Sequence, residues 1–163
     1  MARSSYRERR FASLCAPQKA DMLRYAYWLC RDRAVAEDVV QESLLRAWKS
    51  IDALESAAAV KPWLLTIVRR EFARTFERKR HETVDVAALE SSGDAALAAA
   101  TDPGVDDMRR AMLRLEPIYR EPLVLQVLFG YSTAEIASHL DISQPAVLTR
   151  LFRAREKLRE ELA

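Results

Sequence analysis

The segment Ser132–Arg155, with the sequence STAEIASHLDISQPAVLTRLFRAR, determines the fold expected for the C-terminal part of the chain. Ser132 and Glu135 form the pattern of a capping box, which predicts a short helix over 133–140. A tight turn at 140–143 follows, and Ser143 is placed to cap a second helix over 144–161. Two short helices joined in this way are typical of a helix-turn-helix.

The apolar residues of this segment recur at helical spacing and are expected to form a small core between the two helices. They are Ile136, Ala137, Leu140, Ile142, Val147 and Leu151. The opposite face of the second helix is then free to enter a DNA major groove, with Gln144 at base edges and Arg150 and Arg153 on phosphate or guanine. The candidate duplex-DNA residues are Ser143, Gln144, Ala146, Thr149, Arg150 and Arg153. The alternative is an αα-hairpin within a generic helical bundle.

The composition of the whole chain favours helices. Half of the 163 residues are apolar, 31% are charged and only 3 are glycine. We expect an all-α protein with two small helical domains, at 1–80 and 105–163, joined by a flexible linker at 81–104. Further helices are predicted at 16–30, 34–49, 61–80, 105–115 and 119–129.

Charge is distributed unevenly, although the net charge is only +2. Residues 61–80 are rich in Lys and Arg, whereas residues 82–107 contain acids and no Lys or Arg. This asymmetry indicates functional surfaces separated by an acidic connector, although charge runs can also be ordinary solvated faces.

Several classes of function are disfavoured. The two cysteines and two histidines lack metal-ligand spacing, so we expect no metal and no cofactor. No nucleophile–base pair, paired carboxylates or phosphate loop is evident, so we expect no enzyme. No apolar run approaches about 18 residues, and no hydrophobic signal segment follows the basic N-terminus. We therefore expect no membrane insertion and a cytoplasmic location.

The predicted helix at 61–80 combines cations with aromatic residues. Arg70, Arg74 and Arg78 recur at i, i+4 and i+8, where cations without a partner repel one another and would favour a polyanion. Aromatic rings among them suit single-stranded nucleic acid, because bases stack on the rings. Phe72 is interpreted as core, while Trp63 and Phe76 are open to either role. The candidate residues are Trp63, Arg69, Arg70, Arg74, Phe76 and Arg78.

The predicted helix at 34–49 has a different outer face, made of Asp38, Gln41, Glu42, Leu45 and Arg46. A leucine exposed among polar residues suits a protein partner better than DNA. The alternative is a solvated helix face with one stray leucine.

Three motifs together resemble the two-domain extracytoplasmic-function sigma factors of the sigma-70 family. They are AEDVVQESLLRAW (36–48), WLLTIVRR (63–70) and EIASHLDISQPAVLTRLFRAREKL (135–158), with an acidic segment between the last two. The resemblance implies sigma region 2 in the first domain and sigma region 4 in the second. It further implies core RNA polymerase (β′ clamp and β flap), promoter DNA and a cognate anti-sigma factor as partners.

The resemblance also implies roles for the candidate residues. The 34–49 face matches the helix that docks on the β′ clamp, and loop 50–60 matches the segment that captures a flipped −10 base. The helix at 61–80 matches the −10 binding and melting helix, and the helix-turn-helix matches the −35 reader. Arg70 and Arg74 stand where the family often has Asn and Asp, which favours a phosphate-binding role here.

Two other functions would fit part of the sequence. An ordinary helix-turn-helix regulator would account for 105–160 but leave 36–80 without a role. A sigma mimic that sequesters an anti-sigma factor without binding DNA should have lost its basic DNA faces, which this chain retains.

Overall fold

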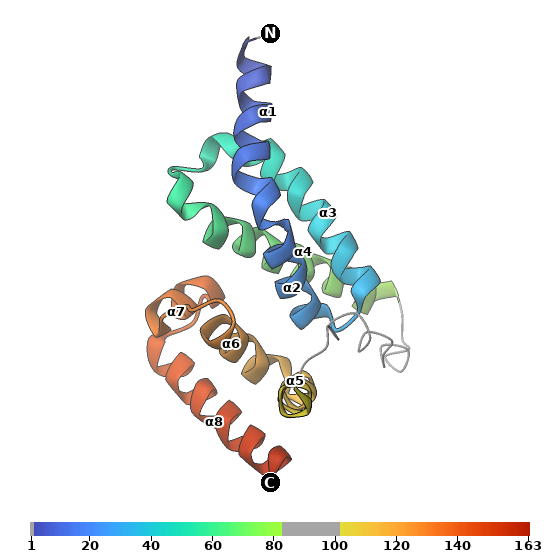
Figure 1. The fold of residues 1–163 in the computed structure, drawn as a ribbon, viewed down its shortest axis with the longest axis vertical. Helices are drawn as coiled ribbons and strands as arrows, with labels where there is room; N and C mark the ends of the chain where they lie inside the picture. The colour runs from blue at the N-terminus through green and yellow to red at the C-terminus, as the bar shows by residue number, and fades with distance from the viewer. Residues whose placement is uncertain (1, 83–101) are drawn as a thin grey trace. The chain divides into compact units, whose positions relative to one another are not determined.

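The computed structural model describes residues 2–82 and 102–163, and for residues 79–82 it describes the backbone alone. The chain divides into two compact units, which fall within residues 1–93 and 94–163. All regular elements in the described part are helical (Figure 1), which confirms the all-α expectation. No helix in the described ranges is long and apolar enough to span a membrane.

The N-terminal unit contains four α-helices, α1 (Ala2–Cys15), α2 (Lys19–Cys30), α3 (Arg33–Ser50) and α4 (Val60–Glu82). Short 3-10 turns lie at Ala16–Gln18, Ile51–Ala53 and Ala57–Ala59. Helices α2, α3 and α4 pack against one another and form the body of this unit. Asp32 caps α3, because its side chain accepts a hydrogen bond from the Val35 amide at 3.1 Å.

Helix α1 was not predicted, since the sequence places the first helix only at 16–30. Figure 1 shows α1 leading into α2 and passing the turn between α3 and α4. Most of α1 is exposed, and Cys15 is its one fully buried residue. A helix that is mostly exposed has no wide apolar stripe, and that stripe is the pattern by which a sequence indicates a helix. The polar sequence of α1 therefore did not predict it.

The buried face of α4 differs from the predicted one. Leu64, Leu65, Val68 and Glu71 are buried, whereas Phe72, which we interpreted as core, is only partly buried. A carboxylate in this position is stable only with cationic or hydrogen-bonding partners, and Glu71 has two arginines beside it.

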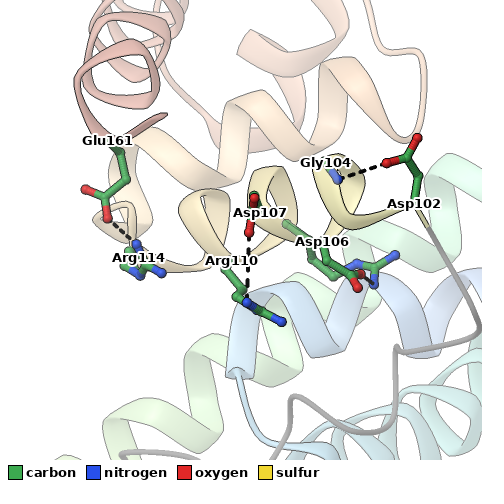
Figure 2. Close-up of polar contacts among 8 residues, drawn as sticks. Asp102, Gly104, Asp106, Asp107, Arg110, Arg114 and Glu161 are labelled. Carbon is green, nitrogen blue, oxygen red and sulfur yellow. Dashed lines mark hydrogen bonds and ion pairs between the residues drawn. The ribbon is translucent and has the colours of Figure 1, made fainter. Parts of the chain in front are cut away.

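The C-terminal unit contains α5 (Pro103–Arg114), α6 (Pro117–Val127), α7 (Thr133–Leu140) and α8 (Gln144–Leu162). Helix α8 packs against the other three. Asp102 accepts a hydrogen bond from the Gly104 amide at 3.0 Å, and Arg114 of α5 forms an ion pair with Glu161 of α8 (Figure 2). The segment Asp102–Gly104 therefore opens α5, although we had placed it at the end of the linker. Residues 83–101 of that linker lie outside the described residues.

A buried arginine links α5 to α6. Arg120 is 3% exposed, and its Nη1 donates to the carbonyls of Leu113 at 3.0 Å and Leu115 at 2.9 Å. These carbonyls lie at the C-terminal end of α5, where the helix offers them no partner. Arg120 thereby fixes the chain reversal between the two helices.

Candidate nucleic-acid and protein interfaces

The predicted helix-turn-helix is present in the C-terminal unit. Ser132 and Glu135 form the reciprocal capping box, with bonds of 3.1 and 3.2 Å between side chain and backbone. Asp141 adopts a left-handed conformation with φ of 54°, and the Ile142 amide donates to the Ala137 carbonyl at 3.1 Å. The Ser143 side chain then caps α8 by accepting from the Ala146 amide at 3.2 Å. Local sequence thus fixes both helix ends at the turn.

Five of the six residues predicted to contact duplex DNA lie in α8, and the sixth, Ser143, is the exposed residue that caps it. Gln144, Thr149 and Arg153 are exposed, while Ala146 and Arg150 are partly buried. Thr149 Oγ1 donates to the Pro145 carbonyl at 3.0 Å, so its hydrogen is already used within the helix. Neither Arg150 nor Arg153 forms an ion pair with any residue of the described ranges. Both guanidinium groups are therefore available to an anion.

Gln144 is held by a residue that sequence reasoning missed. Its Nε2 donates to Thr133 Oγ1 at 2.9 Å, so the first residues of α7 and α8 are joined side chain to side chain. This bond orients the amide and leaves Gln144 Oε1 and one N–H for a base edge. The polar Thr133 at the start of α7 was the one sign of this contact in the sequence. The sequence could not predict that Thr133 pairs with Gln144, because the pairing depends on the angle between α7 and α8.

The basic residues of α4 lie in two environments. Arg70 and Arg78 are exposed and have no ion pair with a described residue, whereas Arg69 is partly buried and has contacts of its own. Arg74 differs, because its Nη1 lies 2.9 Å from Glu71 Oε1. The expectation that these cations lack partners is therefore wrong for Arg74. The sequence analysis assigned no role to Glu71, so this pairing was outside it.

Glu71 also contacts the neighbouring helix. Arg46 of α3 forms an ion pair with the same carboxylate oxygen that Arg74 contacts. Glu71 is 2% exposed, while both arginine side chains are about half exposed. This buried carboxylate joins the candidate protein-docking face on α3 to the candidate DNA face on α4.

The aromatic residues of α4 are partly available to a ligand. Phe76 is 53% exposed, and its ring centre lies 6.0 Å from that of the partly buried Phe72. Trp63 is partly buried. Phe76 is therefore the aromatic residue of this set whose ring is best placed to meet a base.

The predicted protein-docking face of α3 is exposed. Asp38, Gln41, Glu42 and Leu45 all face solvent, and Leu45 is 55% exposed. Ala36, Val40 and Ala47 of the same helix are buried on its other side, which fixes the orientation of α3. Arg46 belongs to this face but is already bound to Glu71.

Two further arginines of α1 contact backbone carbonyls where α3 ends. Arg7 contacts the Trp48 and Lys49 carbonyls at the end of α3, and Arg10 contacts the Ile51 and Leu54 carbonyls in the turn that follows. Sequence reasoning assigned them no role, because α1 itself was not predicted.

Comparison with known proteins identifies both units. The family model described as Sigma-70 region 2 matches residues 18–82, and the one described as Sigma-70, region 4 matches residues 106–158. The ECF RNA polymerase sigma factor SigL of Mycobacterium tuberculosis is 32% identical over 145 residues, which cover 86% of this chain and 81% of SigL. The probable RNA polymerase sigma factor RfaY of Xanthomonas campestris is 35% identical over 146 residues. That match covers 82% of this chain but only 36% of RfaY.

A solved structure shows the same fold. The sigma factor RpoE of Bartonella quintana, in complex with the anti-sigma factor NepR, aligns with a TM-score of 0.76 and 25% identity. The alignment covers 93% of this chain and 96% of RpoE. The two family matches and the shared fold thus define a transcription initiation factor. The chain belongs to the extracytoplasmic-function sigma factors of the sigma-70 family, which direct RNA polymerase in transcription initiation.

Proposed function

We propose that this chain uses three separate faces to bring core RNA polymerase to a promoter. The α3 face docks on the β′ clamp, α4 holds the opened −10 region, and α8 reads the −35 duplex. The observation that carries this proposal is that the candidate residues of α3, α4 and α8 lie on the exposed sides of their helices. Transcription in vitro with purified core polymerase tests it directly, because the chain must support promoter-dependent initiation.

Docking on core polymerase is expected to depend on the polar residues and the exposed leucine of α3. Leu45 offers apolar area beside Gln41 and Glu42, which lie one helical turn earlier, with Asp38 a turn before them. Protein interfaces combine apolar and polar side chains in this way. Arg46 contributes less, because leaving Glu71 would break an existing ion pair.

The double substitution Asp38→Ala with Leu45→Ala should weaken binding to core polymerase by about tenfold or more, since central interface residues each contribute about 1 kcal/mol or more. Helical content should not change, because both side chains are exposed. Binding is measured by titration of labelled core polymerase, with circular dichroism for the fold. Glu37→Ala, also exposed on α3 but outside the docking set, is the matched control. Unchanged affinity of the double variant would refute the docking assignment.

The two kinds of arginine on α4 should behave differently when replaced. Arg70→Ala removes an available cation and should lower open-complex formation on all promoters. The slope of the logarithm of DNA affinity against the logarithm of salt concentration should become shallower by about one unit. Arg74→Ala also removes a partner of buried Glu71, so it should lower the melting temperature as well. Permanganate footprinting of the −10 region and thermal unfolding of each variant separate the two effects. Equal melting shifts for both variants would contradict this division.

The C-terminal unit also offers apolar side chains to protein partners. Leu148 and Phe152 of α8 are 54% and 61% exposed, and they lie one helical turn apart. Exposed apolar groups of this kind mark protein contacts. They support the β flap and a cognate anti-sigma factor as partners, the latter by analogy with the RpoE–NepR complex.

We further propose that the chain performs no chemistry of its own and acts in the cytoplasm, where core polymerase is found. Burial raises the pKa of the Cys15 thiol, although Arg10 lowers it in part. Burial, with Glu135 nearby, raises the pKa of Tyr131 to about 12. Both groups therefore stay protonated at neutral pH, and neither is activated as a nucleophile or base.

A further inference from the structure

Arg7 of α1 binds the C-terminal end of α3. Its Nη2 donates to the Trp48 carbonyl at 2.9 Å and lies 3.5 Å from the Lys49 carbonyl. The last carbonyls of a helix lack intrahelical partners, and a cation beside them is favoured by the helix dipole. The guanidinium carbon also lies 5.0 Å from the centre of the Trp48 ring. Arg7 therefore fixes the point where α3 ends and the turn begins.

Arg10 of α1 binds the next part of the same turn. Its Nη1 donates to the Ile51 carbonyl at 3.3 Å and its Nη2 donates to the Leu54 carbonyl at 3.0 Å. These two carbonyls flank the 3-10 turn Ile51–Ala53, so one guanidinium spans it. The side chains of Ile51 and Leu54 are buried. The turn is therefore held by apolar packing on one side and by arginine on the other.

The exposed tip of the turn begins immediately after this anchor. Residues 55–58 are all exposed, and Glu55 and Ser56 are the polar side chains among them. After Ser56 the chain enters the 3-10 turn Ala57–Ala59, which leads directly into α4. The position of this tip is therefore set by Leu54 at one end and by α4 at the other.

We propose that Arg7 and Arg10 are positioning residues for base selection at the −10 element, because they hold the tip 55–58 in the conformation that receives an extruded base. This rests on the role that the resemblance implies for loop 50–60, the capture of a flipped −10 base, which we add here to the proposed function. Extruding a base already costs unstacking energy. A tip ordered before DNA arrives adds no further ordering cost, and it can reject bases whose edges do not match.

The test compares holoenzymes that carry Arg7→Gln, Arg10→Gln or Arg9→Gln. Arg9 is the matched control, because its replacement removes the same charge from the same helix, while its hydrogen bond within the described residues goes to the Ser5 carbonyl of α1, at 3.3 Å. Each holoenzyme transcribes a promoter library randomised at −10. We expect Arg10→Gln to reduce discrimination among bases at the extruded position by about tenfold. Affinity for core polymerase and preference at −35 should not change.

Rescue and a tip variant separate positioning from mere stabilisation. Arg10→Lys keeps the charge and one donor, so it should recover part of the base discrimination, while Arg9→Gln should keep all of it. A uniform loss on every promoter, or an equal change in Arg9→Gln, would overturn the proposal. The tip variant Glu55→Ala with Ser56→Ala tests the capture role itself. If it alters discrimination while Arg10→Gln does not, the turn captures the base and the arginines do not position it. If neither variant alters discrimination, the turn does not capture the base, and the positioning role of the arginines fails as well.

A second measurement requires no DNA. A glutamate-specific protease cuts after Glu55. Cleavage requires the backbone around Glu55 to open locally and leave the conformation that Arg10 holds. We expect cleavage there to be about tenfold faster in Arg10→Gln than in Arg9→Gln. Equal rates in a folded Arg10→Gln protein would show that Arg10 does not hold the tip.

Discussion

Replacement of Arg120 by alanine is expected to destabilise the C-terminal unit by about 3 kcal/mol, because two buried carbonyls lose a donor and each costs about 1–3 kcal/mol when left unsatisfied. The carbonyls are those of Leu113 and Leu115, 3.0 and 2.9 Å from Arg120 Nη1. A unit of this size has a total stability of roughly 3–9 kcal/mol. The substitution should therefore remove a large part of it.

Thermal unfolding followed by circular dichroism checks this expectation. The transition of the C-terminal unit should fall by about 10 °C or more, since each kcal/mol shifts the midpoint of a small domain by about 4–8 °C. Arg120→Met retains most of the side-chain volume but no donor, so it separates lost hydrogen bonds from lost packing. Arg159→Ala, exposed on α8, is the control and should change stability by less than about 0.5 kcal/mol. An unchanged transition in Arg120→Ala would mean that the carbonyls find other donors.

The helix ends of the described chain could be predicted where the signal is local. Asp32, Ser132 and Ser143 each cap a helix by accepting from an amide three residues later. Such a contact depends on a few neighbouring residues, so the sequence contains all the information that it needs. The same holds for the helix-turn-helix, in which the capping box, the turn and the apolar spacing agree.

Features that depend on distant residues were missed. Arg7 and Arg10 bind carbonyls 41 to 44 positions away, and nothing near them in the sequence indicates that turn. The burial of Glu71 was not predicted, because one of its two arginine partners, Arg46, comes from another helix. In both cases long polar side chains stabilise tertiary contacts, which hydrophobic periodicity does not report.

For the face that we propose to read the −35 duplex, the side on which the residues lie could be predicted, but their contacts could not. Gln144, Arg150 and Arg153 lie together on the outer side of α8 as expected. The bond from Gln144 to Thr133 was outside the prediction, because it joins the starts of two helices whose crossing angle the sequence does not specify. That bond restricts how Gln144 can approach a base, so it bears directly on specificity.

Gln144→Ala is expected to change which −35 sequences are preferred, with a loss of about 5- to 150-fold in discrimination at one position. A good base-edge contact contributes about 1–3 kcal/mol of discrimination, which corresponds to that range. Arg153→Ala should act differently, because a lost phosphate contact weakens binding nearly uniformly and lowers the salt dependence by about one unit. Transcription by each holoenzyme from a library randomised at −35 distinguishes a changed preference from a uniform loss.

Thr133 supplies the matched control for this prediction. Thr133→Val keeps the shape of the side chain but removes the oxygen that accepts from Gln144 Nε2 at 2.9 Å. If that bond orients the amide, Thr133→Val should relax preference at the same −35 position as Gln144→Ala, and by less. In the Gln144→Ala background it should then have no further effect on preference, because the two residues act through one contact. Additive changes at two different positions would show that Thr133 and Gln144 contribute separately. A uniform loss in Gln144→Ala would instead assign it to the phosphate backbone.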